Sequence, residues 1–594
     1  MEELRFVRGG SFLIESISPQ EVFTPEDFTE EHRLIAKAAT DFAIGEVQPL
    51  IEDIEEKKEG LLPSLVRKAG ELGFLSADIP EDFGGQGLDK ISSLLITEKL
   101  TPGGASFIVA SQVHTGIGSL PIVLFGNRDQ KKRYLPKIAT GETIGAYALT
   151  EPEAGSDALN AKTTAKLSPD GKYYILNGQK QFISNSGYAG VFITYAKVDG
   201  DKFTALIVDG DSEGISLDEE ENKMGVKGSS TRSVIFNDVK VPVENVLGEV
   251  GKGHIIAFNT LNIGRYKMGG NCVGYSKIAL QDAMTYAKQR VQFGKPICEF
   301  GMIKSKIAEM VIRTFMGESM AYRTAGLIDK ILKPIDPHAD DSGTLTAKGI
   351  EEYAIEASIN KVYISEMLDY VVDEAVQIYG GYGYIHDYPV ERYYRDSRVN
   401  RIWEGTNEIN RIVIMDSLIK RSMKNRLPLL PATEKVASEP PSYQGPLETD
   451  DKRLALQKGL LEMAKRMTLL VMGTAIRKFK EKLSEEQEII ALISDMVIEI
   501  FAMESGLLRA LKSMERTENE KLQLQNAMVK VYVNDSFKQV EWLAAQALAA
   551  IADGDTVKTH LSVLEKLPRF APINTVALKR EIANAVIKVG RYPF

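Results

Sequence analysis

One carboxylate in the chain stands where it could abstract a proton. Glu404 lies between the bulky Trp403 and Gly405, and the apolar residues at 409–413 follow with the spacing of one helix face. Thr406 is placed to cap that helix, so the sequence predicts a tight turn at Glu404 just before a helix start. Shielding from water by Trp403 would disfavour the charged carboxylate and make it a better base. A surface glutamate before an ordinary helix is the alternative that this tetrapeptide leaves open.

The composition indicates an ordinary soluble protein of several domains. The 594 residues are 44% hydrophobic and 26% charged, and that length suggests roughly four domains. The net charge of −10 argues against a nucleic-acid partner. Cys272 and Cys298 are the only cysteines, which fits a reducing compartment. We find no signal peptide and no apolar stretch long enough for a membrane span, and therefore expect a cytoplasmic protein.

Changes in residue pattern divide the chain into domains that must position Glu404. Helical periodicity dominates 26–146 and returns over 251–426, and strand patterns fill 147–250 between them. The proline-rich stretch 427–449 is interpreted as a linker, and 450–594 is helical again.

The region of strand patterns contains two pairs of strand-like runs. Asn177-Gly178 separates the runs 173–176 and 179–184, and predicts a hairpin turn. A polar turn separates Val191–Val198 from 203–208, and predicts a second pair of strands. We expect a small β domain inserted between helical regions.

Three longer motifs stand in a fixed order along the chain. The run 147–157 reads YALTEPEAGSD and is dense in hydroxyl groups and small residues. RVQFG follows at 290–294. QIYGGYGY at 377–384 leads on to Arg395-Asp396 and then to WEGT at 403–406. In sequence, order and spacing, from about 26 to 425, these motifs resemble the acyl-CoA dehydrogenase family of flavoproteins.

The resemblance implies a mainly α fold. In this family a middle β-barrel domain lies between an N-terminal helical domain and a helical bundle domain, with FAD in the cleft. The helical region beyond the linker, and the run GMIKSKIA at 301–308, are similar to the very-long-chain branch. The resemblance therefore implies an additional C-terminal helical domain, which we expect to fold back on its own subunit through residues such as Leu456, Leu460, Met463 and Met467.

The resemblance also assigns residues to the cofactor. Phe182 and Ser184 match the pair beside the flavin ring, and Phe182 keeps an aromatic ring where many members carry Trp. The segments around Arg290 and Gln377 match positions that reach the FAD of a neighbouring subunit, which implies a homodimer. The complete set of implied FAD contacts is Tyr147, Leu149, Thr150, Ser156, Phe182, Ser184, Arg290, Gln292, Phe293, Gln377, Gly380, Gly381, Thr406 and Glu408.

By the same resemblance, Glu404 is the base that removes the α proton of an acyl-CoA thioester, and its own N–H helps to hold the carbonyl oxygen. Flavin takes hydride from the β carbon on the opposite face. The implied substrate-side residues are Ser156, Asn262, Arg265 and Gly405. For Arg265, a position on a helix surface is an equal alternative.

The function implied is oxidation of long-chain acyl-CoA in fatty-acid β-oxidation, with electrons passed to an electron-transfer flavoprotein. The small residues at 109–113 align with the floor of the acyl pocket and favour a deep pocket, although they could equally serve only to pack a helix. An acyl-CoA oxidase and a non-catalytic scaffold of the same fold remain alternatives, and peripheral contact with a membrane remains open. No G-x-G-x-x-G follows a strand, and the six histidines show no paired metal-ligand spacing.

Overall fold

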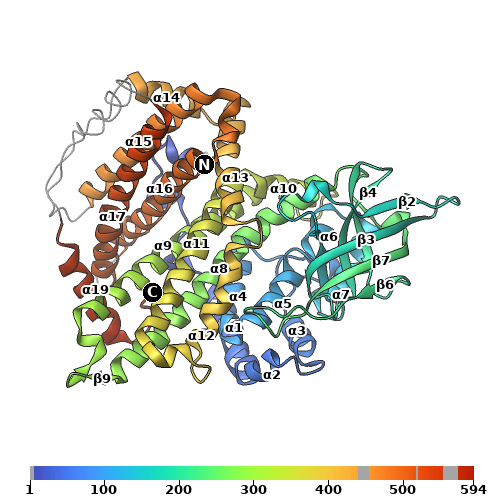
Figure 1. Ribbon diagram of the computed structural model, residues 1–594, viewed down its shortest axis with the longest axis horizontal. Coiled ribbons are helices and arrows are strands. Elements are labelled where there is room, and N and C mark those ends of the chain that lie inside the picture. The colour runs from blue at the N-terminus through green and yellow to red at the C-terminus, as the bar shows by residue number, and fades with distance from the viewer. Residues whose placement is uncertain (1–5, 439–453, 517–519, 553–572) are drawn as a thin grey trace.

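The computed structural model describes residues 6–438, 454–516, 520–552 and 573–594. Figure 1 shows the strands of the large sheet at one end of the molecule, the C-terminal helices α15, α16 and α17 at the other, and most of the remaining helices between them. This arrangement confirms the predicted mainly helical fold with strands inserted after the first helical region.

Seven helices form the first region. Polar caps fix two of their starts: Asp89 accepts the N–H of Ser92 at 2.7 Å, and Asn127 and Gln130 form a reciprocal capping box. The helices are α1 (Glu30–Phe42), α2 (Ile51–Glu55), α3 (Leu61–Glu71), α4 (Lys90–Lys99), α5 (Ala105–Thr115), α6 (Leu120–Phe125) and α7 (Arg128–Ala139).

The segment Ala105–Phe125 corrects one expectation from the sequence. By length and composition alone it is apolar enough to cross a membrane, and it is the single such segment among the described residues. In the structure it is broken into α5 and α6, and 78% of its apolar window is buried inside the protein. Burial in the core accounts for its composition.

Eight strands form one mixed sheet with its own apolar core. Their order is β6-β7-β3-β2-β4-β5-β8, and β1 pairs with β4 in parallel. The two end strands, β6 and β8, are not paired with each other in the described part of the chain. The strands are β1 (Gly145–Ala148), β2 (Thr164–Leu167), β3 (Tyr173–Ser184), β4 (Val191–Val198), β5 (Lys202–Asp209), β6 (Ile215–Leu217), β7 (Thr231–Pro242) and β8 (Val246–Leu247).

The hairpin predicted at Asn177-Gly178 is wrong. Strand β3 runs through both residues and pairs with β7 on either side of a register shift there. Gly178 has φ of 151°, and a Cβ on it would lie 2.7 Å from the Cα of Thr163. The glycine therefore serves a bulge and a close backbone approach. The second predicted pair is confirmed, because β4 and β5 are antiparallel neighbours.

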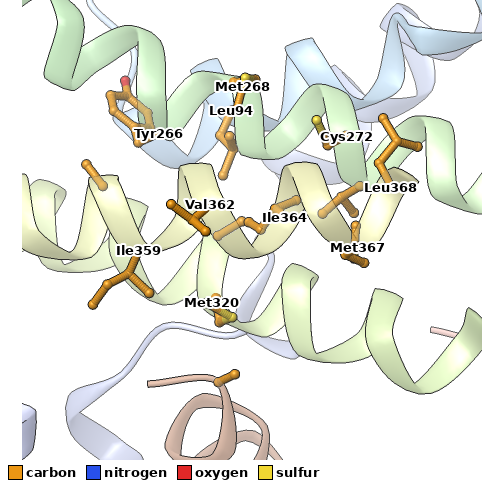
Figure 2. Packing of buried hydrophobic residues seen from close by; sticks show 14 of the residues in the cluster. Leu94, Tyr266, Met268, Cys272, Met320, Ile359, Val362, Ile364, Met367 and Leu368 are labelled. Carbon is orange, nitrogen blue, oxygen red and sulfur yellow. The ribbon is translucent and has the colours of Figure 1, made fainter. Parts of the chain in front are cut away.

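The helical bundle is built around α11, which packs between α8 and α9. Figure 2 shows Leu368 of α11 next to Cys272 of α8, with Met320 of α9 on the other side of α11. The elements of this region are α8 (Gly253–Gln289), β9 (Val291–Gln292), β10 (Lys295–Pro296), α9 (Gly301–Leu332), α10 (Ser342–Glu352), α11 (Ala354–Tyr379), α12 (Val390–Ser397) and α13 (Asn407–Met423).

The linker expected at 427–449 is partly helical. Leu429–Ser438 forms α14, with Pro431 in its first turn, where proline is tolerated. Residues 439–449 lie outside the described part of the chain. Where the structure describes it, the region beyond is helical as predicted, with α15 (Ala455–Phe479), α16 (Gln487–Met514), α17 (Glu520–Ile551) and α19 (Thr575–Val589).

The C-terminal helices fold back on the rest of the chain, as expected. Leu456, Leu460, Met463 and Met467 are all buried. Two buried ion pairs at 2.6 Å join α9 to α16: Arg323–Glu504 and Glu318–Arg509.

The N-terminal segment 6–25, to which the sequence assigned no structure, also contacts the C-terminal helices. The Phe12 ring meets the Phe501 ring edge-on at 4.9 Å. Lys512 donates to the carbonyl oxygen of Val22 at 2.7 Å.

Candidate active site

Glu404 lies in the predicted turn, directly before α13. Glu404 and Gly405 both have left-handed backbones, with φ of 57° and 80°. Thr406 caps α13 by accepting the N–H of Ile409 at 3.2 Å. The side-chain amide of Asn410 donates to the Gly405 carbonyl at 2.8 Å and to the Thr406 carbonyl at 3.0 Å. A left-handed glutamate costs about 1–3 kcal/mol, and such strain is concentrated at functional sites.

The carboxyl group of Glu404 has room because the residue opposite is Gly264 of α8. A Cβ at Gly264 would come within 2.6 Å of Oε1. The other oxygen, Oε2, is buried and accepts no hydrogen bond from the described residues. An unpartnered carboxylate oxygen is free to receive a proton.

Burial raises the pKa of Glu404 to about 7, and the positive charges of Arg265 and Lys361 oppose that rise. A pKa near the working pH suits a general base, because the group is ionised in a large fraction of molecules and still binds a proton well. The raised pKa agrees with the predicted shielding of this carboxylate from water. It does not by itself test the catalytic role of Glu404.

Arg265 is buried, so the helix-surface alternative is wrong. Its Nε donates to the carbonyl oxygen of Glu404 at 3.1 Å, and Nη1 donates to Oδ1 of Asn262 at 2.9 Å. Burial lowers the pKa of Arg265 to about 10, with the charge of Glu404 acting in the opposite direction. The structure thus brings together three of the selected residues, Asn262, Arg265 and Glu404.

The motif 147–157, which begins in β1, reaches the same site. Tyr147 is buried, and its hydroxyl has no hydrogen-bond partner in the described chain. Burial is the main cause of its strongly raised pKa, and the charges of Tyr195 and Glu404 add to it. Leu149 is buried, Thr150 partly buried and Ser156 exposed. The loop therefore starts beside Glu404 and passes outward to solvent.

A buried ion pair that the sequence reasoning missed holds this loop. Nζ of Lys180 in β3 lies 2.7 Å from Oε1 of Glu151 and donates to the Leu149 carbonyl at 3.2 Å. The same carboxylate accepts the N–H groups of Lys162 and Thr163. A lysine at an inward position of a strand was the available signal, because such a charge needs a partner.

Phe182 lies where β3 passes this loop. The N–H of Gln181 donates to the Thr150 carbonyl at 2.9 Å, and the register of β3 shifts between Lys180 and Ile183. Phe182 takes a φ of 58° and leaves 58% of its surface exposed. An aromatic ring turned outward by a bulge fits a planar ring system stacked beside it. Ser184, partly buried, ends the strand.

A second group of selected residues lies at the ends of α8 and α11. Tyr286 and Tyr379 stack at 4.1 Å and join these ends. Phe293 is 95% exposed, and nothing lies within 4 Å of a Cβ built on Gly380 or Gly381. Arg290, Gln292 and Gln377 are also exposed.

Within one copy of the chain, the structure does not bring the two groups together. In Figure 1, β9 of the second group and β3 of the first lie at opposite ends of the view. Of the remaining selected residues, Thr406 caps α13 and Glu408 is exposed in its first turn.

The first group fits a flavin nucleotide on three counts. A stacking ring is exposed at Phe182, a buried hydroxyl at Tyr147 lacks a partner, and open space surrounds a Cβ built at Gly155 in the hydroxyl-rich loop. Backbone and hydroxyl groups of such a loop are suited to an extended pyrophosphate.

Comparison with known proteins identifies this architecture. Residues 29–142, 146–239 and 251–419 match the N-terminal, middle and C-terminal domains of acyl-CoA dehydrogenases, and a further acyl-CoA dehydrogenase C-terminal domain matches 463–566. A probable acyl-CoA dehydrogenase of Bacillus subtilis is 47% identical over 98% of both chains. The very long-chain specific acyl-CoA dehydrogenase of Macaca fascicularis mitochondria is 34% identical, covering 75% of this chain and 69% of that one.

The structural comparison agrees. An acyl-CoA dehydrogenase from Bacillus anthracis, crystallised in complex with FAD, superimposes with a TM-score of 0.96 at 49% identity, over 99% of this chain and 100% of that one. The chain therefore belongs to the acyl-CoA dehydrogenase family, whose members are FAD-dependent oxidoreductases that act on acyl-CoA substrates.

Proposed function

We propose that this protein oxidises long-chain acyl-CoA to the trans-2-enoyl-CoA in fatty-acid β-oxidation, with Glu404 as the catalytic base and FAD as its cofactor. The observation that carries this proposal is the Glu404 carboxyl group, which lies against Gly264, has an unpartnered oxygen and has a pKa raised to about 7. When bound, FAD supplies the chemistry of hydride acceptance from the β carbon.

The residues around Glu404 divide the remaining work. The carboxylate takes the α proton, and the Glu404 N–H steadies the oxygen of the thioester carbonyl as negative charge develops there. Arg265 holds the carbonyl end of the same residue at 3.1 Å, so the turn stays fixed while the carboxyl end changes charge. Asn262, Gly405 and Ser156 are proposed to line the path of the substrate.

The proposed cofactor contacts form two sets. Tyr147, Leu149, Thr150, Ser156, Phe182 and Ser184, with Thr406 and Glu408, would hold the FAD of their own subunit. Arg290, Gln292, Phe293, Gln377, Gly380 and Gly381 would reach the FAD of a second copy in a homodimer. Their exposure, and their separation from Phe182 within one copy, support the second assignment.

Two features support a long-chain substrate. Residues 109–113 on α5 are small or moderate in size (Val, Ala, Ser, Gln, Val). The very long-chain specific relative aligns over 75% of this chain, which is more than the first three matched domains span. We propose an electron-transfer flavoprotein as acceptor, a cytoplasmic location, and peripheral contact with membranes where such substrates gather.

Glu404→Gln tests the proposal, because glutamine keeps the size of the side chain but cannot accept the α proton. FAD should stay bound, while anaerobic reduction of the flavin by acyl-CoA slows roughly a thousandfold. The exposed Glu434→Gln on α14 is the matched control. Near-normal reduction in Glu404→Gln would refute the assignment of the base.

Acyl-CoA of graded length, in the same assay on the unaltered protein, tests the chain-length preference. Long chains should reduce the flavin with the highest kcat/KM. Oxygen uptake compared with reduction of a dye acceptor then separates a dehydrogenase from an oxidase. Oxygen uptake as fast as dye reduction would count against an electron-transfer flavoprotein as the acceptor.

A further inference from the structure

Behind the catalytic turn lies a buried lysine that the proposed mechanism does not use. Lys361 belongs to α11, the helix that Figure 2 shows packed between α8 and α9, and no part of it is exposed. A buried ammonium group destabilises the fold unless charge or hydrogen bonds compensate it. Its Nζ donates to Oδ1 of Asn407 at 2.6 Å, and an amide oxygen carries no full negative charge.

Asn407 is the first residue of α13, three positions after Glu404. Its amide nitrogen donates to Oγ of Ser365 at 3.1 Å and to Oε1 of Glu366 at 2.9 Å. The bond to Glu366 fixes which end of the amide faces Lys361, because a carboxylate oxygen can accept only from the amide nitrogen, which leaves the amide oxygen for the ammonium group. The lysine is thereby tied to the start of the helix that the catalytic turn precedes.

The C-terminal domain supports this arrangement. Arg411 of α13 reaches both oxygens of Glu366, at 3.1 and 3.3 Å, and its Nε lies 2.7 Å from Oδ1 of Asp495 in α16. The contacts therefore run without a break from α16 through Arg411, Glu366 and Asn407 to Lys361.

The charged groups that act on Lys361 come from α8, from α11 itself and from the turn before α13. Burial is the first cause that lowers the pKa of Lys361, to about 7. The charge of Glu404 opposes that change, Arg265 adds to it, and Cys272 and Glu366 contribute weaker attraction. An ionised Glu404 and a protonated Lys361 therefore favour each other. Glu404 in turn is acted on by burial and then by the two cations, Arg265 and Lys361, and its own charge acts on the phenol of Tyr147.

We propose that Lys361 is a positioning residue for Glu404: its buried ammonium group, tethered to Asn407, stabilises the ionised form of the carboxyl group and keeps it available as a base. The inference rests on the proposed function in that Glu404 is taken to be the base. Without the lysine, only the positive charge of Arg265 would counteract the rise in the pKa of Glu404 that burial causes. A larger share of Glu404 would then be protonated at neutral pH and unable to accept the α proton.

Infrared difference spectroscopy during a pH titration of the purified holoenzyme reads the protonation of Glu404 directly. The carboxylic C=O band that disappears in Glu404→Gln belongs to this residue. In Lys361→Met the midpoint of that band should rise by about one pH unit or more, the effect of losing a nearby opposite charge. Lys361→Arg keeps the charge and should return the midpoint toward the wild-type value. An unchanged midpoint in folded Lys361→Met would overturn the proposal.

Two further variants separate charge from structure. Lys361→Gln is neutral but keeps a donor toward Asn407, so it should show the same upward shift even if Lys361→Met folds poorly. Lys465→Met removes another buried lysine, paired with Glu504 at 2.6 Å in the C-terminal domain. It should lower thermal stability and leave the Glu404 midpoint in place. A midpoint that moves equally in Lys465→Met would show a general effect of destabilisation, and would refute the specific role of Lys361.

The kinetic readout distinguishes this inference from the proposed function. If both hold, the acidic limb of kcat/KM against pH should shift upward in Lys361→Met by the same amount as the infrared midpoint. If Glu404→Gln remained active, the proposed base would be wrong, while the infrared comparison would still report whether Lys361 acts on Glu404. An infrared shift without any shift of the kinetic limb would therefore count against the base and not against the coupling.

Discussion

Gly264 and Glu404 lie against each other across 140 positions of sequence, and the absence of a side chain on one makes room for the carboxyl group of the other. A Cβ on Gly264 would stand within 2.6 Å of Oε1 of Glu404. Gly264 lies within α8, where a glycine costs about 1 kcal/mol relative to alanine. The cost is explained if the position is reserved for the carboxyl group of Glu404.

Gly264→Ala should displace the base and leave the fold intact. The new methyl group would meet the carboxyl end of the flexible Glu404 side chain rather than backbone, so the glutamate can move aside. Alanine also has a higher helix propensity than glycine, which favours α8. FAD content and thermal stability should be retained while kcat falls about a hundredfold, because a shift of 1 Å in a catalytic group has an effect of that size.

Gly269→Ala on the same helix is the matched control for Gly264→Ala. Its added Cβ would meet Ile364 and Ala321 only at 3.3 and 3.5 Å. This variant should keep its activity. If Gly264→Ala is as active as Gly269→Ala, the carboxyl group does not occupy the position described for it.

The turn and cap around Glu404 could be predicted from the sequence because they are local. Thr406 and the apolar spacing after it fix the start of α13 within a few residues, and the structure confirms both. Lys361 and Gly264 could not be found in this way. Each contacts the catalytic turn or the start of α13 from more than 40 positions away in the sequence. A lysine or a glycine within a helical pattern does not by itself indicate such a contact.

The Asn177-Gly178 prediction failed for a related reason. Asn-Gly is a strong hairpin signal only when the chain must reverse there, whereas β3 continues because β7 pairs with it on both sides of the bulge. What the glycine accommodates is the backbone at Thr163, a feature of tertiary structure.

Stability should depend on pH through Glu404. Its pKa rises from 4.5 in the unfolded chain to about 7 in the folded protein, so the folded state binds the proton more tightly. The stabilisation by this proton is fully present below about 4.5 and is lost as pH rises through about 7. Glutamine does not ionise, so Glu404→Gln avoids the cost of a buried carboxylate at high pH. It should be more stable than the wild type at pH 8 by on the order of 1–3 kcal/mol.

Denaturant unfolding of both proteins at pH 5 and pH 8 measures this difference, together with the effect of the lost Glu404 charge on the pKa of Lys361. Glu434→Gln, exposed on α14, should track the wild type at both values. A stability difference between Glu404→Gln and the wild type that is the same at pH 5 and pH 8 would contradict a raised pKa of Glu404.

Arg290→Ala should weaken FAD retention through a partner subunit. The guanidinium group lies 5.5 Å from the ring centre of Tyr382, which holds it at the exposed end of α8. A charge-assisted contact to a pyrophosphate would be lost, so FAD content after gel filtration and the melting temperature should both fall. Exposed Arg67→Ala on α3 is the control. Full FAD occupancy in a monomeric wild-type protein would rule out completion of the site by a second copy.

Removal of everything after Leu427 should expose a large apolar and charged surface on the bundle. The ring of Phe315 would lose the Arg509 guanidinium, 4.4 Å from its centre, and the Phe594 ring at 5.4 Å. Glu318 would lose Arg509 and keep Lys277, whereas Arg323 would lose Glu504, its α16 partner at 2.6 Å. A buried charge left without its partner costs about 3–5 kcal/mol.

The truncated protein therefore has two ways to cover this surface, by aggregation or by pairing of two dimers into a tetramer. Multi-angle light scattering beside the full chain, which we predict to be a homodimer, distinguishes these outcomes from a simple loss of mass. We expect the shortened protein to be larger than a dimer, because an exposed apolar face of this size is a liability in water. A fully active and well-behaved truncated dimer would mean that the C-terminal domain does not replace a second dimer, and would favour a role at a membrane surface instead.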